Sequence, residues 1–474
     1  MSVPLAVFGG DAAPVRWGAA RLYTEPGLTV AADAALYYVD DLVRALAGRR
    51  VRAASREPAA LIAAAYRAWG ANAPARLEGD FAFVLWDEAE RRVVAARDFM
   101  GRRPLHHALH GGRLGLAADP AALLALPGAP AGLDVAHLAA RAAGLLEAAD
   151  TPYAGVRLLA AGRTLVAEVG RDGAVHDVAI RRHWEPPTFE RDDGRRLDHA
   201  ADELRDTLAA AVRERLDTAA PTAVWLSGGY DSPAVYGAAQ AMAAAGAGAG
   251  VHAVSMSYPP GDPGREDELV EAVAAHWGAP VRWRRVEEVP VWGDAPAWAR
   301  RRPQPFAHAF EHWLRALAAA AREGGSRVVL DGSGGDQLFQ VGPVFLADLV
   351  RRGRWLAARR EWRALGLGGA GWRRAARFAV LPSLPAWGWR LPALLRGGRP
   401  LRGLRAGVAP AWIRRAGGLG EALAERAELP LVRRPGEGAA ALESRWYFET
   451  SYSAAVFAEV GRIAGECGVE VRSP

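Results

Sequence analysis

Short apolar runs separated by Gly- and Pro-containing turns make up the first part of the chain. The runs Phe81–Trp86 and Arg92–Ala96 predict paired strands of a buried sheet, because each has the length and composition of a strand and a polar turn joins them. Arg113–Ala117 is a third candidate strand, and the helical candidates are Asp40–Ala47 and Pro58–Trp69. This part of the chain is therefore expected to combine a buried sheet with helices.

Longer helical segments alternate with apolar runs in the second part. Leucine and valine residues at helical spacing predict an amphipathic helix over Leu197–Leu216 that packs on a sheet. Predicted strands and helices then follow in turn: strands at Pro221–Leu226, Val251–Ser257 and Arg327–Leu330, and helices from Pro233, over Glu266–Trp277 and over Phe310–Arg322. This alternation predicts an α/β domain, a parallel sheet with helices on both faces.

A polar, Pro-rich stretch over Trp184–Arg196 separates the two parts and is typical of an interdomain linker. We therefore expect one domain over residues 1–185 and a second over residues 197–474. Within the second, Arg351–Arg434 is rich in Arg, Trp, Gly and Pro and predicts helical pieces broken by proline.

Composition narrows the class of protein. Of the 474 residues 51% are hydrophobic and 24% charged, which is typical of a globular protein. All 59 basic residues are arginine, so the chain has no lysine amine for Schiff-base chemistry. A single cysteine, Cys467, excludes an internal disulfide and a cysteine-based zinc site. Neither a signal-like N-terminus nor a run of about 20 apolar residues is present, so we expect a cytoplasmic protein.

The net charge of +6 is weak evidence about partners. It partly reflects arginine standing in place of lysine, and we expect no nucleic-acid partner. The arginine- and tryptophan-rich segment 351–434 leaves contact with a membrane surface open, although a solvated arginine face with tryptophan in the core is the simpler interpretation.

The segment Val224–Ser232 joins an apolar strand to a helix through the loop Ser-Gly-Gly-Tyr-Asp-Ser. Its two glycines let the backbone approach an anion closely, and the N-terminus of the following helix favours negative charge at the same place. Ser227 and Ser232 add hydroxyl donors. Because Asp231 repels a bare phosphate, its carboxylate fits best with Mg²⁺ between the two. The loop predicts a pyrophosphate site with a metal ion, and a simple Gly-rich turn is the structural alternative.

A second loop of the same kind lies within Val328–Phe339 (VVLDGSGGDQLF). It also follows an apolar strand and contains an acid, Asp336. In an open parallel sheet such turns meet at the carboxyl ends of the strands, where ligands bind. Asp231 and Asp336 are therefore expected to share metal ions bound to one triphosphate, with a tight structural turn as the alternative.

These loops resemble those of the asparagine synthetase superfamily. The stretch Leu77–His107 is similar to the family's amidotransferase-like domain, and Val254–Gly278 is similar to the family stretch after the second strand. The resemblance covers nearly the whole chain. It implies an N-terminal αββα domain of the N-terminal-nucleophile type and a C-terminal ATP-pyrophosphatase-type synthetase domain. It also implies an ATP- and Mg²⁺-dependent ligase that adenylates a carboxylate and transfers it to an amine.

Two departures from the family pattern concern the chemistry. A glutaminase of this family needs a cysteine directly after the initiator methionine, where this chain has Ser2, and the family's Asn-Gly element is replaced by LYYVDD over Leu36–Asp41. The first domain is therefore expected not to hydrolyse glutamine. Asparagine synthetases also carry a glutamate where this chain has Ser333, so the group that assists ammonia attack is absent.

Superfamily members that lack both groups close rings within one substrate, as β-lactam synthetases and lasso-peptide cyclases do. The stretch Leu330–Trp355 looks most like the lasso-cyclase, or macrolactam synthetase, branch. That resemblance implies a lasso precursor peptide as substrate, with a leader-binding protein and a protease as partners. It also implies further helices and a lysine beyond the Arg-Ser-Pro at 472–474, so we expect the C-terminal domain to be truncated.

The resemblance and the loops together assign roles to a small set of residues. The residues expected to bind ATP are Leu226, Ser227, Gly228, Gly229, Asp231, Ser232, Met256 and Gly332. Leu226 and Met256 line the adenine through backbone contacts in this assignment, and Asp231 and Asp336 are the catalytic and Mg²⁺-binding acids. Three alternatives stay open: an asparagine synthetase-like enzyme that uses ammonia, a tRNA- or NAD-modifying member of the wider group, which the N-terminal domain disfavours, and a non-catalytic scaffold.

Overall fold

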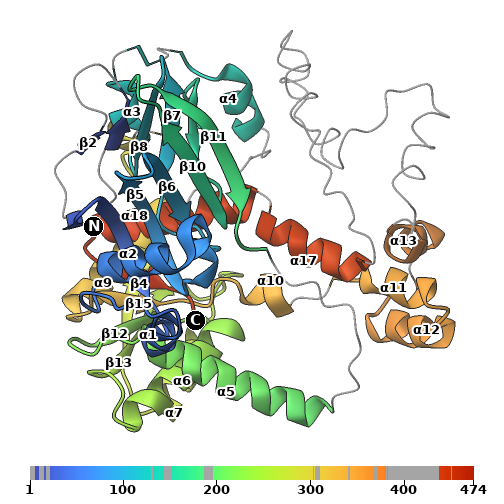
Figure 1. Ribbon diagram of the computed structural model, residues 1–474. Coiled ribbons are helices and arrows are strands. Elements are labelled where there is room, and N and C mark those ends of the chain that lie inside the picture. The colour runs from blue at the N-terminus through green and yellow to red at the C-terminus, as the bar shows by residue number, and fades with distance from the viewer. Residues whose placement is uncertain are drawn as a thin grey trace.

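A computed structural model gives the fold of the chain (Figure 1). It describes residues 6–9, 15–17, 22–126, 128–129, 132–142, 151–185, 196–302, 304, 310–339, 342–367, 369, 371–380, 382, 437–449 and 451–474. Two antiparallel sheets occupy the N-terminal region, and one parallel sheet between helices occupies the C-terminal region. Residues 186–195, within the expected linker, lie outside the described residues.

Each N-terminal sheet pairs strands that are antiparallel throughout. The first has the order β2 (Val15–Trp17), β1 (Ala6–Phe8), β8 (Arg113–Ala117), β7 (His106–His110) and β9 (Val156–Leu158). The second has the order β11 (Val175–Arg182), β10 (Arg163–Val169), β6 (Arg92–Arg97), β5 (Gly79–Asp87), β4 (Leu28–Leu36) and β3 (Leu22–Glu25). The predicted pairing of the runs at 81–86 and 92–96 is confirmed, and the third predicted strand, β8, belongs to the other sheet.

The N-terminal region has four layers because both faces of its central strand β5 are buried. Ala82, Val84 and Trp86 pack between the two sheets. The alternate residues of the same strand, among them Phe83, face α1 (Val39–Gly48) and α2 (Pro58–Trp69). On the far side α3 (Pro120–Leu124) covers the first sheet, and α4 (Val135–Ala142) follows it. This arrangement confirms the expected αββα fold.

The C-terminal sheet is entirely parallel. Its order is β14 (Val281–Arg285), β13 (Val251–Ser257), β12 (Thr222–Trp225), β15 (Val328–Leu330) and β16 (Glu470–Arg472). One face is covered by α5 (Leu197–Arg215), α6 (Asp231–Ala244) and α7 (Asp267–His276), and the other by α9 (Glu311–Glu323) and α18 (Ser451–Glu466). The predicted parallel sheet with helices on both faces is confirmed.

The strand order has a direct consequence for ligand binding. From β12 the chain builds outward through β13 and β14, and then returns to add β15 on the opposite side of β12. The order therefore reverses between β12 and β15, and in open α/β sheets ligands bind outside the carboxyl ends of the strands at such a reversal. Both Gly-rich loops begin there.

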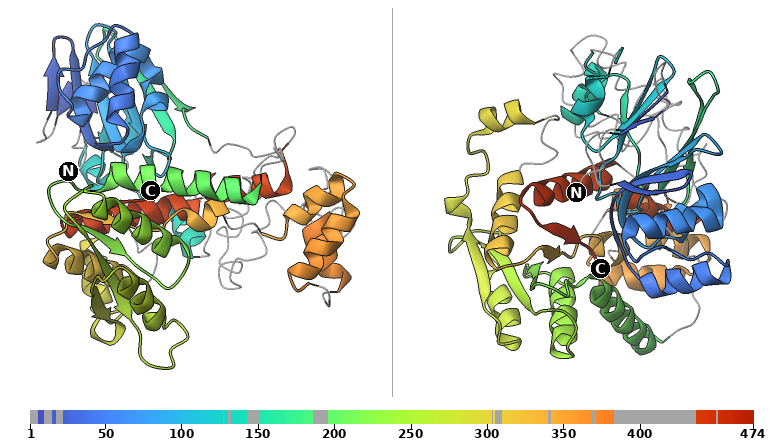
Figure 2. Two further views of the ribbon diagram at one scale, coloured as in Figure 1. Left: turned by 90° about the horizontal axis from the view of Figure 1, so that it is seen from below. Right: turned by 60° about the vertical axis from the view of Figure 1, so that its left-hand side comes forward.

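Three features differ from the sequence expectation. The N-terminal half of α5 does not pack on the sheet: Leu197 is 86% and Leu204 47% exposed, because the helix projects past the sheet (Figure 2). Val212 and Leu216, near the other end, are the buried positions. Two strands of the C-terminal sheet had no predicted counterpart, because β14 carries three arginines among five residues and β16 has three residues in all.

The remaining helices flank this framework. They are α8 (Ala295–Arg301), α10 (Gly335–Phe339), α11 (Phe345–Arg351), α12 (Trp355–Ala364), α13 (Trp372–Ala375) and α17 (Ala439–Glu449). The helices α11, α12 and α13 form a lobe at one side of the molecule (Figure 1). The predicted helical pieces of the Arg- and Trp-rich segment are present as far as it is described, and residues 383–436 lie outside the described part. Across the described ranges, no helix combines the length and apolar character that crossing a bilayer requires.

Candidate functional site: two glycine-rich loops at one sheet edge

The first Gly-rich loop is closed by its own serines. It connects the end of β12 at Trp225 to α6, which begins at Asp231. The Ser227 N–H donates to Ser232 Oγ at 2.9 Å, and the two hydroxyl oxygens lie 2.8 Å apart. Asp231 lies in the first turn of α6, where the helix dipole favours a negative charge.

The second loop follows β15 and turns into the short helix α10. Asp331, directly after the strand, is buried, and it accepts a hydrogen bond from Ser333 Oγ at 2.7 Å. Gly334 has a backbone φ of 102°, a conformation that residues other than glycine rarely adopt. Asp336 lies in the first turn of α10.

The two loops touch each other. A Cβ added at Gly335 would lie 2.3 Å from both Cγ and Oδ2 of Asp231, and a Cβ added at Gly332 would lie 2.8 Å from the Ser232 backbone nitrogen. Glycine is needed at both positions because any side chain would occupy the space of the other loop. The structure thus brings Asp231, Ser232 and Gly332 into contact.

The two acids interact electrostatically. Burial and, secondly, the negative charge of Asp336 raise the pKa of Asp231 above its usual value. Neither carboxylate forms an ion pair with an arginine of the described residues. This edge of the sheet therefore presents two adjacent acids whose mutual repulsion a cation would relieve.

The acid pair fits a metal that arrives with a phosphate ligand. Over the described ranges, no group of three or more His, Cys, Asp or Glu residues is arranged to hold a metal ion. Mg²⁺ characteristically binds through one or two carboxylates together with substrate phosphates and water, and so needs no complete protein cage. Asp231 and Asp336 match that donor set, and they are the residues that would hold the ion.

The two residues expected near adenine lie at the same sheet edge, one strand apart. Leu226 is buried, its N–H donates to the Val254 carbonyl at 3.0 Å, and its carbonyl accepts from Ser255 Oγ at 2.7 Å. Met256 pairs with Arg284 in the register of β13 with β14. Their contact with adenine stays a prediction.

Sequence reasoning missed Glu266, which the structure places against the first loop. Its Oε2 accepts a hydrogen bond of 2.7 Å from the Gly228 N–H. The neighbouring Asp267 fixes this position, because it accepts hydrogen bonds from the Ser257 hydroxyl and the Tyr258 N–H at the end of β13. An acidic run at the start of a helix was the available signal, and it does not reveal which distant N–H group donates a hydrogen bond to the carboxylate.

The N-terminal domain contains a buried cluster of polar groups around Asp98 and Asp80. Asp98 accepts hydrogen bonds from the Phe81 N–H at 3.0 Å and the Gly101 N–H at 2.7 Å, and burial, followed by the charge of Asp80, raises its pKa to about 7. The Tyr37 hydroxyl donates to Asp80 at 2.6 Å. Ser2, which stands where the expected nucleophile would be, lies outside the described residues.

Comparison with known proteins gives two family matches that divide the chain. A model described as a glutamine amidotransferase domain matches residues 21–178, and a model described as asparagine synthase matches residues 203–474. Three curated relatives align with parts of the chain. Amidase chry2 of Gibberella zeae is 26% identical over 302 residues, 61% of this chain. Asparagine synthetase [glutamine-hydrolyzing] 3 of Bacillus subtilis is 26% identical over 238 residues, 49% of this chain. A putative asparagine synthetase [glutamine-hydrolyzing] of Mycobacterium bovis is 32% identical over 184 residues, 37% of this chain.

The matched parts amount to less than half of each relative: 43%, 37% and 27% of their respective lengths. These proteins are therefore similar to this chain over part of their length. The asparagine synthase match, in contrast, takes in more than half of the 474 residues and includes both Gly-rich loops. On that match the chain belongs to the asparagine synthase family, with an amidotransferase-like domain ahead of its synthetase domain.

Proposed function

We propose that the protein is an ATP- and Mg²⁺-dependent ligase that activates a carboxylate by adenylation and joins it to an amine. The observation that carries this proposal is the contact between the two Gly-rich loops at the β12/β15 reversal, where Asp231 lies against Gly335 and interacts electrostatically with Asp336. Enzymes of the asparagine synthase family use ATP with Mg²⁺, which suits this pair of acids.

Each part of the site has a physical task in this proposal. The N–H groups of Gly228 and Gly229 and the hydroxyls of Ser227 and Ser232 bind the β- and γ-phosphates, with Gly332 closing the far side. Leu226 and Met256 hold the adenine against the ends of β12 and β13. Asp231 and Asp336 hold Mg²⁺, which when bound neutralises charge on the phosphates and on the departing pyrophosphate.

In this structure the Glu266 carboxylate accepts the Gly228 N–H, which is one of the donors assigned to phosphate. Because its carboxylate accepts the Gly228 N–H, a phosphate oxygen has to take its place at that donor. A phosphate oxygen then replaces the Glu266 carboxylate, so the Gly228 N–H has a hydrogen-bond acceptor both before and after nucleotide binding.

The reaction proceeds in two displacements. A substrate carboxylate oxygen attacks the α-phosphorus, the bond to the bridging oxygen breaks, and pyrophosphate leaves. A substrate amine then attacks the acyl carbon, AMP leaves with the bonding electrons, and the amine releases its proton to solvent. The protein's contribution is to hold the reacting ends together, which replaces a bimolecular encounter by an effectively intramolecular one.

For the amine, we favour the N-terminus of a peptide whose internal Asp or Glu is the activated acid, that is, macrolactam formation on a lasso precursor. Ser333 supports this assignment, because it stands where ammonia-using members have a glutamate, and its hydroxyl is occupied by Asp331. A leader-binding protein and a protease are the partners that such a peptide requires.

The second candidate is an asparagine synthetase-like enzyme supplied with free ammonia. The Bacillus subtilis relative named asparagine synthetase favours it. In both candidates the same two loops bind ATP, so the candidates differ in the acceptor and not in the nucleotide site.

Carboxylate-dependent exchange of labelled pyrophosphate into ATP tests the proposal. A peptide with a free N-terminus and an internal acid is expected to support exchange and to yield a product lighter by one water in mass spectrometry. Exchange with aspartate, and asparagine formation with ammonium, would select the second candidate. Absence of exchange with every carboxylate, in protein that binds no ATP, would refute the nucleotide assignment.

A further inference from the structure

The N-terminal domain reaches into the second Gly-rich loop through one buried side chain. Arg102, between β6 and β7, is 1% exposed, and its Nη2 lies 3.0 and 3.1 Å from the two carboxylate oxygens of Asp331. The same nitrogen donates to Ser473 Oγ, and the Ser473 hydroxyl donates to Asp331. A carboxylate at the start of the phosphate loop is therefore paired with an arginine from the other domain.

The structure around Arg102 fixes the guanidinium in place. The Phe457 ring of α18 lies beneath it, with the guanidinium carbon 5.3 Å from the ring centroid. A Cβ at Gly461 of α18 would lie 2.3 Å from the Arg102 carbonyl oxygen, so helix and loop approach as closely as glycine permits. Met100 of the same segment lies near the second loop, 3.8 Å from a Cβ placed at Gly334. Arg102 is thus held from two sides.

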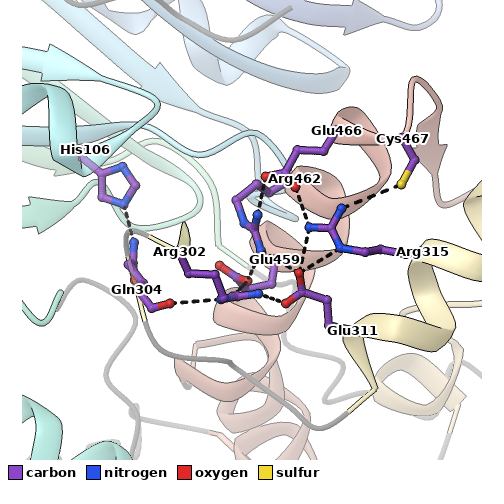
Figure 3. Close-up of polar contacts among 9 residues, drawn as sticks. All are labelled: His106, Arg302, Gln304, Glu311, Arg315, Glu459, Arg462, Glu466 and Cys467. Atoms are coloured by element: carbon purple, nitrogen blue, oxygen red, sulfur yellow. Dashed lines mark hydrogen bonds and ion pairs between the residues drawn. The ribbon is translucent and has the colours of Figure 1, made fainter. Parts of the chain in front are cut away.

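The helix that supports Arg102 is itself anchored by charges. Alternating arginines and glutamates connect α18 to α9 and to the segment before α9 (Figure 3): Arg302, Glu311, Arg315, Glu459, Arg462 and Glu466. All six residues belong to the C-terminal domain, and α18 lies between the N-terminal domain and the C-terminal sheet (Figure 2). The network therefore fixes the helix against which the Arg102 guanidinium packs.

We propose that Arg102 is a positioning residue for the nucleotide phosphates, acting through Asp331. This inference rests on the proposed function, since it concerns how the second loop accepts an anion. An unpaired Asp331 would add a negative charge beside the triphosphate and would leave the loop without its buried partner. Pairing with Arg102 compensates that charge, so the second loop can accept an anion. The amidotransferase-like domain thereby contributes to the ATP site through Asp331.

Arg103, the next residue, serves as the matched control. It also crosses the domain interface, with Nη1 2.8 Å from Asp33 and Nη2 2.8 Å from Glu470 on β16. Its partners lie on strands and not in either Gly-rich loop. Loss of Arg103 therefore removes an interdomain ion pair without changing the charge of the phosphate site.

Calorimetric titration of the full chain with ATP, pyrophosphate and AMP, each with Mg²⁺, tests the proposal. Arg102→Met is expected to weaken ATP and pyrophosphate by about tenfold, the effect of one unpaired charge near a partly buried anion site, and to change AMP by less than about twofold. Arg103→Met is expected to change all three by less than about twofold. Combining Arg102→Met with Asp331→Asn is expected to restore most of the ATP affinity, because the unpaired charge is gone.

The AMP comparison separates positioning from a structural role, since a disturbed fold would weaken ATP and AMP alike. Equal weakening of both ligands, no weakening in Arg102→Met, or no recovery in the double variant would overturn the proposal. If Arg102→Met does not fold, Asp331→Asn alone decides: it leaves Arg102 positive, so ATP affinity at or above that of the unaltered protein supports the proposal and weaker affinity contradicts it. Failure of the unaltered protein to bind ATP would instead refute the proposed function.

Discussion

Gly335→Ala offers a sharp test of the contact between the two loops. The added methyl carbon would lie 2.3 Å from Cγ and Oδ2 and 2.7 Å from Oδ1 of Asp231, where ordinary carbon contacts are about 3.5–4.0 Å. The carboxylate must therefore retreat by about 1 Å or more. Because the atoms that move are the end of a side chain, we expect the free energy of unfolding to change by less than about 1 kcal/mol.

The expected effect on ligand binding is much larger. Disturbing the orientation of a metal-binding carboxylate typically costs about 10–100-fold in metal affinity, and we expect a loss of that size in the Kd for ATP with Mg²⁺. Calorimetric titration gives the Kd, and denaturant unfolding gives the stability. The control is Gly237→Ala in α6, the helix that begins at Asp231, where the nearest atoms to the new Cβ are 3.8 and 3.9 Å away on Trp277. If Gly335→Ala bound ATP as tightly as Gly237→Ala, the loops would not form one site.

Three further predictions concern charge and burial. Asp336→Asn should weaken Mg²⁺-dependent ATP binding, because it removes one of the two metal-binding acids. The acid limb of the remaining binding should move to lower pH, because burial and, secondly, the charge of Asp336 raise the pKa of Asp231; titrations between pH 4 and 8 measure both effects. Arg97→Met should lower the free energy of unfolding by about 3 kcal/mol or more in urea denaturation, because buried Arg97 donates to three backbone carbonyls. The control Arg56→Met breaks an exposed ion pair and should lower the free energy of unfolding by less than about 1 kcal/mol. Burial lowers the pKa of His106 to about 3, so below pH 6.5 this side chain takes up a proton in the unfolded chain and not in the native protein. This histidine alone should lower the stability by about 1.4 kcal/mol per pH unit below that value. His106→Asn should reduce the slope of stability against pH, whereas an unchanged slope would contradict the assignment.

Local patterns were sufficient to predict much of the framework. The apolar runs at 81–86, 92–96 and 251–257 are strands because each supplies residues for a buried face, and that requirement is visible in the sequence. The two Gly-rich loops could be expected to meet, since both follow strands of a parallel sheet.

Long-range partners could not be predicted in the same way. Arg102 and Asp331 are 229 positions apart, and nothing in either local segment indicates that the two side chains meet. The three residues of β16 give no strand pattern in the sequence, and the strand is recognised only from its pairing with β15 in the structure. The exposed start of α5 shows the converse limit, because helical spacing indicates an apolar stripe but not how far the sheet beneath it extends.

The most direct measurement for the central claim is a pair of titrations of ATP with Mg²⁺ into the unaltered full chain and into Asp231→Asn. If the two loops form one nucleotide-phosphate site, the unaltered chain binds ATP only when Mg²⁺ is present, and the variant loses that dependence together with most of its affinity. Binding that is equal in the two proteins, or that is independent of Mg²⁺ in the unaltered chain, would contradict the account.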